Sequence, residues 1–142
     1  MVPSGIDKEK LFIQIERLKE HIVKIKNLKK AKISENFLIP ALERNLHLAI
    51  EDCLNIGNHI ISGLSLKRPD TYKEIFKNLK EANIISEGIY KEMVKLVSLR
   101  NRLVHLYWEV KDYEVLKVIE NLKIFDKYVE EILKYLKDKK LI

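Results

Sequence analysis

The chain has 142 residues, 46% of them hydrophobic and 34% charged, which fits one compact domain over residues 1–142. Four Gly and three Pro are too few for an all-β fold built on turns, so helix is expected. A single Cys excludes an internal disulfide and a cysteine-based zinc site. No apolar run approaches the roughly 18 residues of a membrane span, and no signal peptide is recognisable. We therefore expect a soluble, cytoplasmic protein with no membrane association.

Basic residues outnumber acidic residues by 27 to 21, a formal net charge of +6. Such a charge permits binding to a polyanion without establishing it, because most of the excess lies in Lys-rich ends that a solvated helix would carry. Gln14 is the only Gln in a chain rich in Lys, Glu and Ile. This composition is typical of proteins from hot environments, since amides are thermolabile and charge networks gain value with temperature.

The first half of the chain predicts three helices. Apolar residues recur every three or four positions over residues 7–30, which indicates an amphipathic helix with a Lys-rich outer side. Ser34 is a candidate N-cap for a second helix that runs to about residue 62. Residues 63–70 contain Gly, Ser and Pro and predict a loop, and Asp70 is the candidate cap of a short helix to about residue 80.

The second half predicts two more long helices. Ser86 is a candidate cap for one that extends to about residue 110, and Asp112 for a last helix that ends near Lys137. Four long helices and one short helix result. Because short connections make successive helices antiparallel neighbours, the predicted fold is all-α, an up-and-down helical bundle.

The helix over residues 90–110 is expected to carry two apolar faces. On a wheel of about 100° per residue, one stripe is the face that enters the core of the bundle. The opposite side carries a second apolar set, although a helix in a single-domain bundle needs only one buried face. The first stripe contains Leu96, Leu99, Leu103, Leu106 and Val110.

The second face predicts a subunit interface. It contains Val97, Val104 and Trp108, with Asn101 and His105 projecting between them one turn apart. An apolar face with a Trp that the single domain does not need indicates a partner, most simply a second copy in a symmetric homodimer. Each polar pair would then lie beside its symmetry mate.

Arg100 lies on the flank of this second face, close to Tyr107. A planar guanidinium suits a phosphate group, and an imidazole that titrates near neutrality suits proton transfer. Arg100 and His105 therefore fit phosphodiester chemistry. The spacing alone is weak evidence for this chemistry, because a lone Arg and a lone His on a helix are more often a surface ion-pair partner and a packed histidine.

The sequence predicts structural roles for Cys53 and Gly57. Cys53 falls on the apolar face of the second helix, which predicts a small buried side chain. Gly57 within that helix predicts close packing against a neighbouring helix. No two histidines have the i, i+4 spacing of a helical zinc site. We expect neither a metal nor another cofactor.

The segment Leu99-Arg100-Asn101-Arg102-Leu103-Val104-His105-Leu106-Tyr107 resembles the R-x4-H-x-Y signature of HepT-like toxins in the HEPN-domain superfamily. Earlier segments are similar to the same family, in order, and the resemblance covers about residues 7–136. They are residues 43–46, 49–51, 55–61 and 69–72, and Phe76.

This resemblance implies a metal-independent endoribonuclease toxin that works as a homodimer and cleaves RNA at the dimer groove. Its partner would be a minimal nucleotidyltransferase antitoxin that neutralises the toxin by transferring AMP to a tyrosine. By the same resemblance, Arg100 and His105 are the catalytic pair and Asn101 is a supporting residue that binds RNA. Tyr107 is the tyrosine that would carry AMP.

One position departs from the family pattern. Asn55 stands where many relatives carry Asp in a D-I-x-x-H stretch. Any role for the ridge formed by Glu51, Asn55 and His59 is therefore unsupported, and the three are left outside the predicted catalytic set.

Two other functions remain possible on the sequence. The chain could be a non-catalytic, nucleotide- or substrate-binding partner of a nucleotidyltransferase, with Arg100 as a phosphate anchor. It could also be a purely structural dimerising bundle. The polar Asn101 and His105 within an apolar face argue against the structural bundle, because buried polar groups cost free energy unless they are paired or used.

Overall fold

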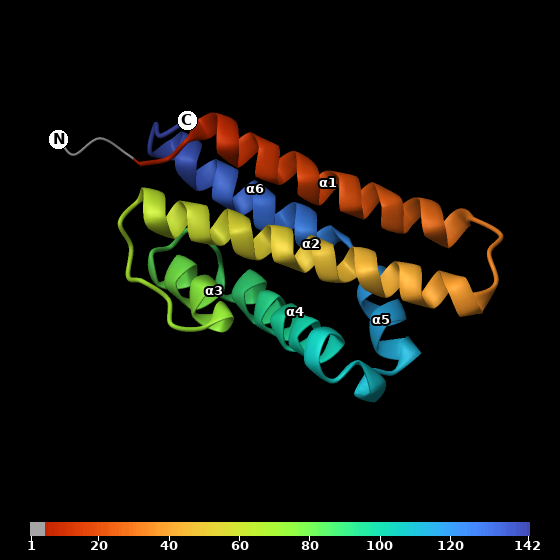
Figure 1. The fold of residues 1–142 in the computed structure, drawn as a ribbon. Coiled ribbons are helices and arrows are strands. Elements are labelled where there is room, and N and C mark those ends of the chain that lie inside the picture. Colours follow the sequence, from red (N-terminus) through yellow and green to blue (C-terminus); the bar gives the residue numbers. More distant parts are fainter. Residues whose placement is uncertain (1–4) are drawn as a thin grey trace.

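The structure is a computed structural model that describes residues 5–142, and these residues form helices and no strand. The predicted all-helical class is therefore confirmed (Figure 1). None of the helices described is long and apolar enough to span a membrane. The elements are α1 (Lys8–Lys30), α2 (Glu35–Gly63), α3 (Tyr72–Glu81), α4 (Glu87–His105), α5 (Asp112–Ile119) and α6 (Lys123–Asp138), with a short 3-10 turn η1 (Tyr107–Glu109).

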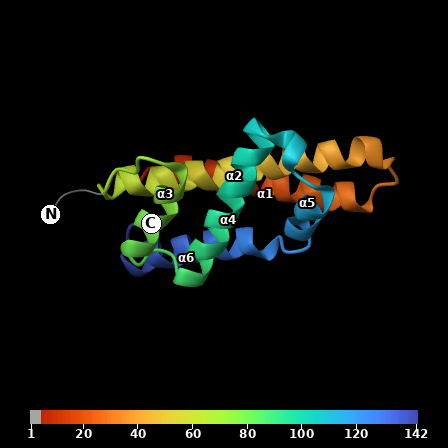
Figure 2. The same ribbon diagram turned by 90° about the horizontal axis from the view of Figure 1, so that it is seen from below.

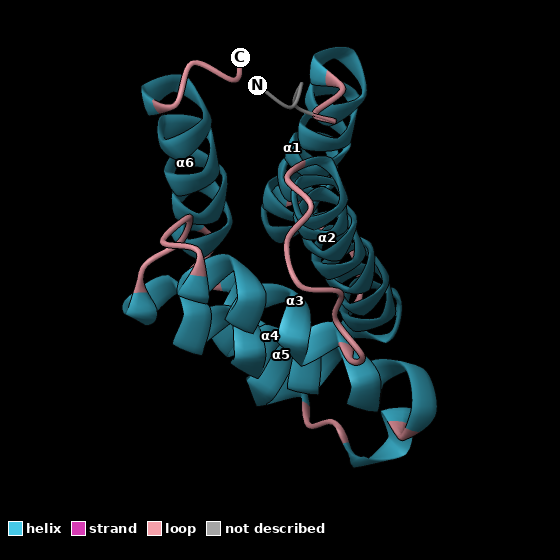
Figure 3. Cartoon of the chain, turned by 90° about the vertical axis from the view of Figure 1, so that its left-hand side faces the viewer, coloured by secondary structure: helices cyan, strands magenta, loops and turns pink. Residues whose placement is uncertain are grey.

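The two longest helices, α1 and α2, form an antiparallel hairpin, and α6 runs alongside them (Figure 1). α3 packs near the C-terminal end of α2, and α5 lies toward its N-terminal end. α4 runs obliquely between α6 and α2 instead of lying along them (Figures 2 and 3). This oblique helix therefore has neighbours on two sides.

Helix starts follow the predicted caps at Ser34 and Ser86, whereas Thr71 and Lys111 take the N-cap positions predicted for Asp70 and Asp112. The side chains of Asp7 and Ser86 each accept a hydrogen bond from the backbone N–H three residues on, at 3.0 and 3.3 Å. Ser34 occupies the N-cap of α2 without a side-chain bond. Thr71, and not Asp70, caps α3. Its hydroxyl oxygen accepts a hydrogen bond from the backbone N–H of Glu74 at 3.2 Å.

The predicted last helix over residues 112–137 is two helices. It is interrupted at residues 120–122, between α5 and α6. Asn121, a residue type that favours turns, lies at the break, and its N–H bonds the carbonyl three residues earlier at 2.9 Å. The turn lets Val115 pack from α5 and Phe125 from α6, both fully buried in the same core.

α4 ends at His105, five residues before the predicted end. Leu106 leaves the helical conformation at φ −138°, so the wheel does not apply beyond it. Leu106 was expected in the core and is 38% exposed, while Val110 remains buried. Val97 was expected at a dimer interface and is fully buried within the single chain, because the neighbours of α4 cover both of its sides here. The assignment of Val97 to a dimer interface is wrong.

Arg102 holds the turn that follows α4. Its guanidinium donates to both carboxylate oxygens of Glu114 in α5, at 2.6 and 3.1 Å, and to the carbonyl oxygen of Glu109 at 3.1 Å. The carboxylate also accepts from the backbone N–H of Lys111 at 2.8 Å. These contacts fix the course of the chain from the end of α4 to α5.

Gly57 allows α2 to approach α3 and α6 closely, as predicted. A Cβ at this position would lie 2.6 Å from Ile75 Cγ2 and 2.9 Å from the hydroxyl of Tyr128. That hydroxyl donates to the carbonyl of Cys53 at 2.8 Å. Cys53 is fully buried, as expected, and burial raises the pKa of its thiol well above the usual range.

We expect Gly57→Ala to destabilise the protein by about 1–3 kcal/mol, because the added methyl group overpacks this contact. Gly88→Ala is the matched control, since a Cβ there meets nothing within 4 Å and alanine favours the helix. Urea unfolding followed by circular dichroism measures both. Equal stability of the two variants would contradict the packing argument.

Candidate active site

Arg100 is held by a carboxylate from a neighbouring helix. Its Nε donates to Glu51 Oε1 of α2 at 2.6 Å, and its Nη2 donates to the same oxygen. Its Nη1 donates to Asn101 Oδ1 at 3.1 Å. The Arg100 side chain is only 11% exposed, so this charge-assisted contact is shielded from water and orients the guanidinium.

The ring of Tyr72, the first residue of α3, supports the same guanidinium. The Arg100 Cζ lies 4.9 Å from the ring centroid, within the range of a cation–π contact. The contacts described use three of the five N–H groups of an arginine, so further N–H groups remain for a ligand. Residues from α2, α3 and α4 thus fix Arg100 in place.

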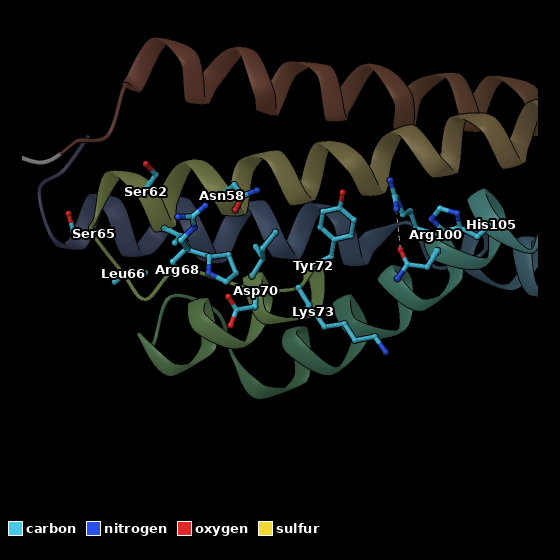
Figure 4. A pocket seen from close by; sticks show the side chains of 15 residues that line it. Asn58, Ser62, Ser65, Leu66, Arg68, Asp70, Tyr72, Lys73, Arg100 and His105 are labelled. Carbon is cyan, nitrogen blue, oxygen red and sulfur yellow. Dashed lines mark hydrogen bonds between the residues drawn. The ribbon is translucent and has the colours of Figure 1, made fainter.

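A pocket of about 1230 Å³ opens beside this arginine. Arg100, Asn101 and His105 all line it, so the structure brings the predicted catalytic pair and its supporting residue together (Figure 4). His105, the last residue of α4, is exposed to solvent. A bound phosphate here would have an oriented cation and an accessible imidazole at the same end of the pocket.

Tyr107 lies outside that pocket. Because α4 ends at His105, Tyr107 falls in η1, whereas the wheel placed it seven residues on and nearly above Arg100 on the same helix. Its ring is 67% exposed and packs edge-on against Trp108, with centroids 5.4 Å apart. It lines a second pocket of about 390 Å³ together with Pro40, Glu43, Arg44, His47, Leu103 and Val104.

Glu51 lies between the two pockets. Its Oε1, which accepts from Arg100, is also 3.3 Å from His47 Nε2, and His47 Nδ1 is 3.5 Å from Arg44 Nη1. Arg44 and His47 line the pocket of Tyr107, and Arg100 lines the larger one. A series of polar side chains along α2 therefore connects the pocket of Arg100 with the pocket of Tyr107.

Glu51 was left outside the predicted catalytic set, and the structure places it in direct contact with Arg100. The other two residues of that ridge lie elsewhere. Asn55 and His59 line a separate pocket near the start of α1, where His59 Nε2 accepts from the N–H of Asp7 at 3.1 Å. Burial lowers the pKa of His59, which favours the neutral form that can accept this bond.

A histidine–carboxylate pair joins α1 to α2. His21 Nδ1 lies 2.5 Å from Asp52 Oδ2, with both side chains largely buried. Burial raises the pKa of Asp52 and the adjacent His21 opposes this shift.

Across residues 5–142, no group of three or more His, Cys, Asp or Glu side chains is placed to hold a metal ion.

Comparison with known proteins identifies the family. The family model described as "Ribonuclease HepT-like" matches residues 13–132. The chain belongs to the HepT-like ribonuclease family. The sequence is 30% identical over 124 residues to the tRNA nuclease HepT of Aphanizomenon flos-aquae, covering 86% of this chain and 84% of that one. It is 32% identical over 89 residues to the mRNA nuclease HepT of Shewanella oneidensis, covering 62% and 67%.

Solved structures of the HepT-like family share the fold. One is the tri-AMPylated Shewanella oneidensis HEPN toxin in complex with the MNT antitoxin, with a TM-score of 0.81 and 26% identity, covering 87% of this chain and 96% of that one. Another, described as a toxin-antitoxin with AMP-PNP, has a TM-score of 0.83 and 25% identity over 89% and 99%. The predicted family, HEPN-like fold and ribonuclease class are confirmed, and a ribonuclease toxin is favoured over a non-catalytic subunit.

We expect Glu51→Gln to lower RNA cleavage by about 10- to 100-fold, because losing the carboxylate charge loosens the guanidinium that it orients. Glu92→Gln is the control, since this α4 carboxylate contacts only solvent-exposed Lys95 at 3.2 Å among the contacts described. Cleavage rates and thermal unfolding are measured together. A Glu51→Gln protein as active as the control would show that the carboxylate does not serve the site.

Proposed function

We propose that this chain is a metal-independent endoribonuclease toxin that acts in the cytoplasm as one HEPN-like domain. Arg100 and His105 are the catalytic residues, and Asn101 supports RNA binding. The observation that carries the proposal is that these three residues meet at one end of a large pocket, with Arg100 held by Glu51. The nuclease names of its relatives supply the class of reaction.

The reaction uses the ribose 2′-hydroxyl as the nucleophile. His105 takes the proton from this hydroxyl, and the 2′-oxygen bonds to the adjacent phosphorus. The bond from phosphorus to the 5′-oxygen breaks, and that oxygen takes up the proton that His105 removed from the 2′-hydroxyl. The products are a 2′,3′-cyclic phosphate and a 5′-hydroxyl. Arg100 donates to the phosphate oxygens and stabilises the negative charge that grows on them in the transition state.

A second copy of the chain is the proposed partner at the end of α4. Three apolar side chains gather there on the surface, and Trp108 is 65% exposed. An exposed cluster of apolar side chains of this kind is typical of an interface. A symmetric homodimer would bring two Arg100 pockets near each other. The three side chains are Val104, Leu106 and Trp108.

A minimal nucleotidyltransferase is the proposed antitoxin, and Tyr107 is the proposed acceptor of AMP. The AMPylated Shewanella toxin in complex with its MNT antitoxin supports this assignment. The phenol oxygen attacks the α-phosphate of ATP bound by the antitoxin, and pyrophosphate leaves. The exposed Tyr107 ring is accessible to such an enzyme, and Arg44 in the same pocket suits the new phosphate.

We expect Arg100→Ala and His105→Ala, made separately, each to lower RNA cleavage by about 100-fold or more. The assay contains a chelator, in which the wild-type protein is expected to remain active. Circular dichroism and sedimentation confirm that each variant keeps its helices and its oligomeric state. Full activity in either variant removes the proposed pair, and wild-type RNA binding without cleavage would favour the non-catalytic alternative.

We expect Trp108→Glu to yield a monomer at concentrations where the wild-type protein is a dimer, since a buried carboxylate at an apolar interface is costly. Sedimentation velocity gives the oligomeric state. Val23→Glu on the outer side of α1, where the side chain is 53% exposed, is the control and should remain dimeric. A dimer that survives the Trp108 substitution would place the interface elsewhere.

We expect the wild-type chain to gain mass in units of AMP when it is co-expressed with a cognate nucleotidyltransferase. Tyr107→Phe should gain none, because the acceptor oxygen is missing. Tyr113→Phe, which alters another exposed tyrosine, is the control and should be modified like the wild type. Intact-mass spectrometry measures all three, and AMP on the Tyr107→Phe chain would assign the modification to another residue.

A further inference from the structure

The large pocket continues past the catalytic end. Tyr72 stands in the middle of it, with Arg100 and His105 on one side (Figure 4). On the other side lie Asn58 of α2 and Arg68 of the loop before α3 (Figure 4). The volume of about 1230 Å³ exceeds the roughly 300–1,000 Å³ typical of a small-molecule site and leaves room for more than one phosphate. The proposed cleavage reaction gives no role to this second end.

The loop that forms the second end is held in place. Asn78, a buried residue of α3, donates from its side-chain amide to the carbonyl of Lys67 at 2.7 Å. Glu74 accepts from the N–H of Asp70 at 2.6 Å, and Thr71 caps the helix that begins at Tyr72. The positions of the loop and of the Tyr72 ring are therefore set before a ligand binds, which lowers the entropy cost of binding.

The side chains at this end have the chemistry of a site for single-stranded nucleic acid. Tyr72 is 45% exposed although it contacts Arg100, so part of its ring surface is open for stacking. Basic residues outnumber acidic residues in the lining, with Arg68, Lys73 and Arg100 against Asp70. Aromatic platforms beside basic residues bind unstacked bases and their phosphates, and amide side chains such as Asn58 bond base edges.

We propose that the second end binds the nucleotide next to the cleaved phosphate. Its base stacks on Tyr72, its far phosphate contacts Arg68, and Asn58 bonds the base edge. The substrate is accordingly single-stranded at this point, because a paired base cannot reach the ring. This inference rests on the proposed ribonuclease function, and it assigns to Tyr72 a contact with the substrate in addition to its contact with Arg100.

Binding of RNA with and without bases tests the proposal. All proteins carry His105→Ala, so that binding is read without cleavage. The two ligands are a short single-stranded RNA and the same ribose-phosphate chain with every base removed. We expect Tyr72→Ala to weaken binding of the intact RNA by about 5- to 150-fold, the range for one stacked base, and Tyr72→Phe to bind normally. Arg68→Ala should weaken binding of both ligands.

The comparison between ligands separates stacking from support of Arg100. On the base-free chain, Tyr72→Ala should weaken binding less than on the intact RNA, because the support of Arg100 is lost in both cases and the stacked base only in the second. Equal weakening on both ligands would assign Tyr72 to positioning Arg100 alone and overturn the proposal, as would unchanged binding of the intact RNA. Wild-type cleavage is assayed separately, so a failure of the ribonuclease function is distinguished from a failure of the subsite.

Discussion

The contact between Glu51 and Arg100 is the interaction on which the site depends. It joins α2, the longest helix, to the oblique α4 and holds a guanidinium that is largely shielded from water. Removing one member of such a pair leaves an uncompensated charge, so the two residues constrain each other. The carboxylate also limits where a phosphate can bind, because it occupies the Nε side of the guanidinium. Asn101 and Tyr72 fix the rest of its surroundings.

The end of α4 separates the two surfaces that the proposed function requires. Inside the helix, Arg100 and His105 line the large pocket. One residue beyond it, the chain turns, and Tyr107 and Trp108 become exposed on a different surface. The contacts of Arg102 with α5 hold this turn. A modifying enzyme can therefore reach the tyrosine without entering the pocket, while the series of polar side chains through Glu51 connects the two places.

Much of the fold and part of the candidate site could be predicted from the sequence, because hydrophobic periodicity and helix caps are local properties. The first four helices and the Arg100–His105 spacing are of this kind. The predictions were wrong where contacts between distant parts of the chain determine where a helix ends and which side chains are buried. Extending the wheel past His105 put Leu106 in the core, and the sequence does not say that α4 has neighbours on both sides at Val97. Glu51 was missed because the relevant contact is between residues 49 positions apart.

The most direct test of the account is a double-mutant cycle between Glu51 and Arg100, read as RNA binding in proteins that all carry His105→Ala. If the carboxylate acts by orienting the guanidinium, Glu51→Gln weakens binding when Arg100 is present and has no further effect when Arg100 is replaced by Ala. Free-energy changes that simply add in the double variant would contradict the account, because the carboxylate would then affect RNA binding independently of Arg100.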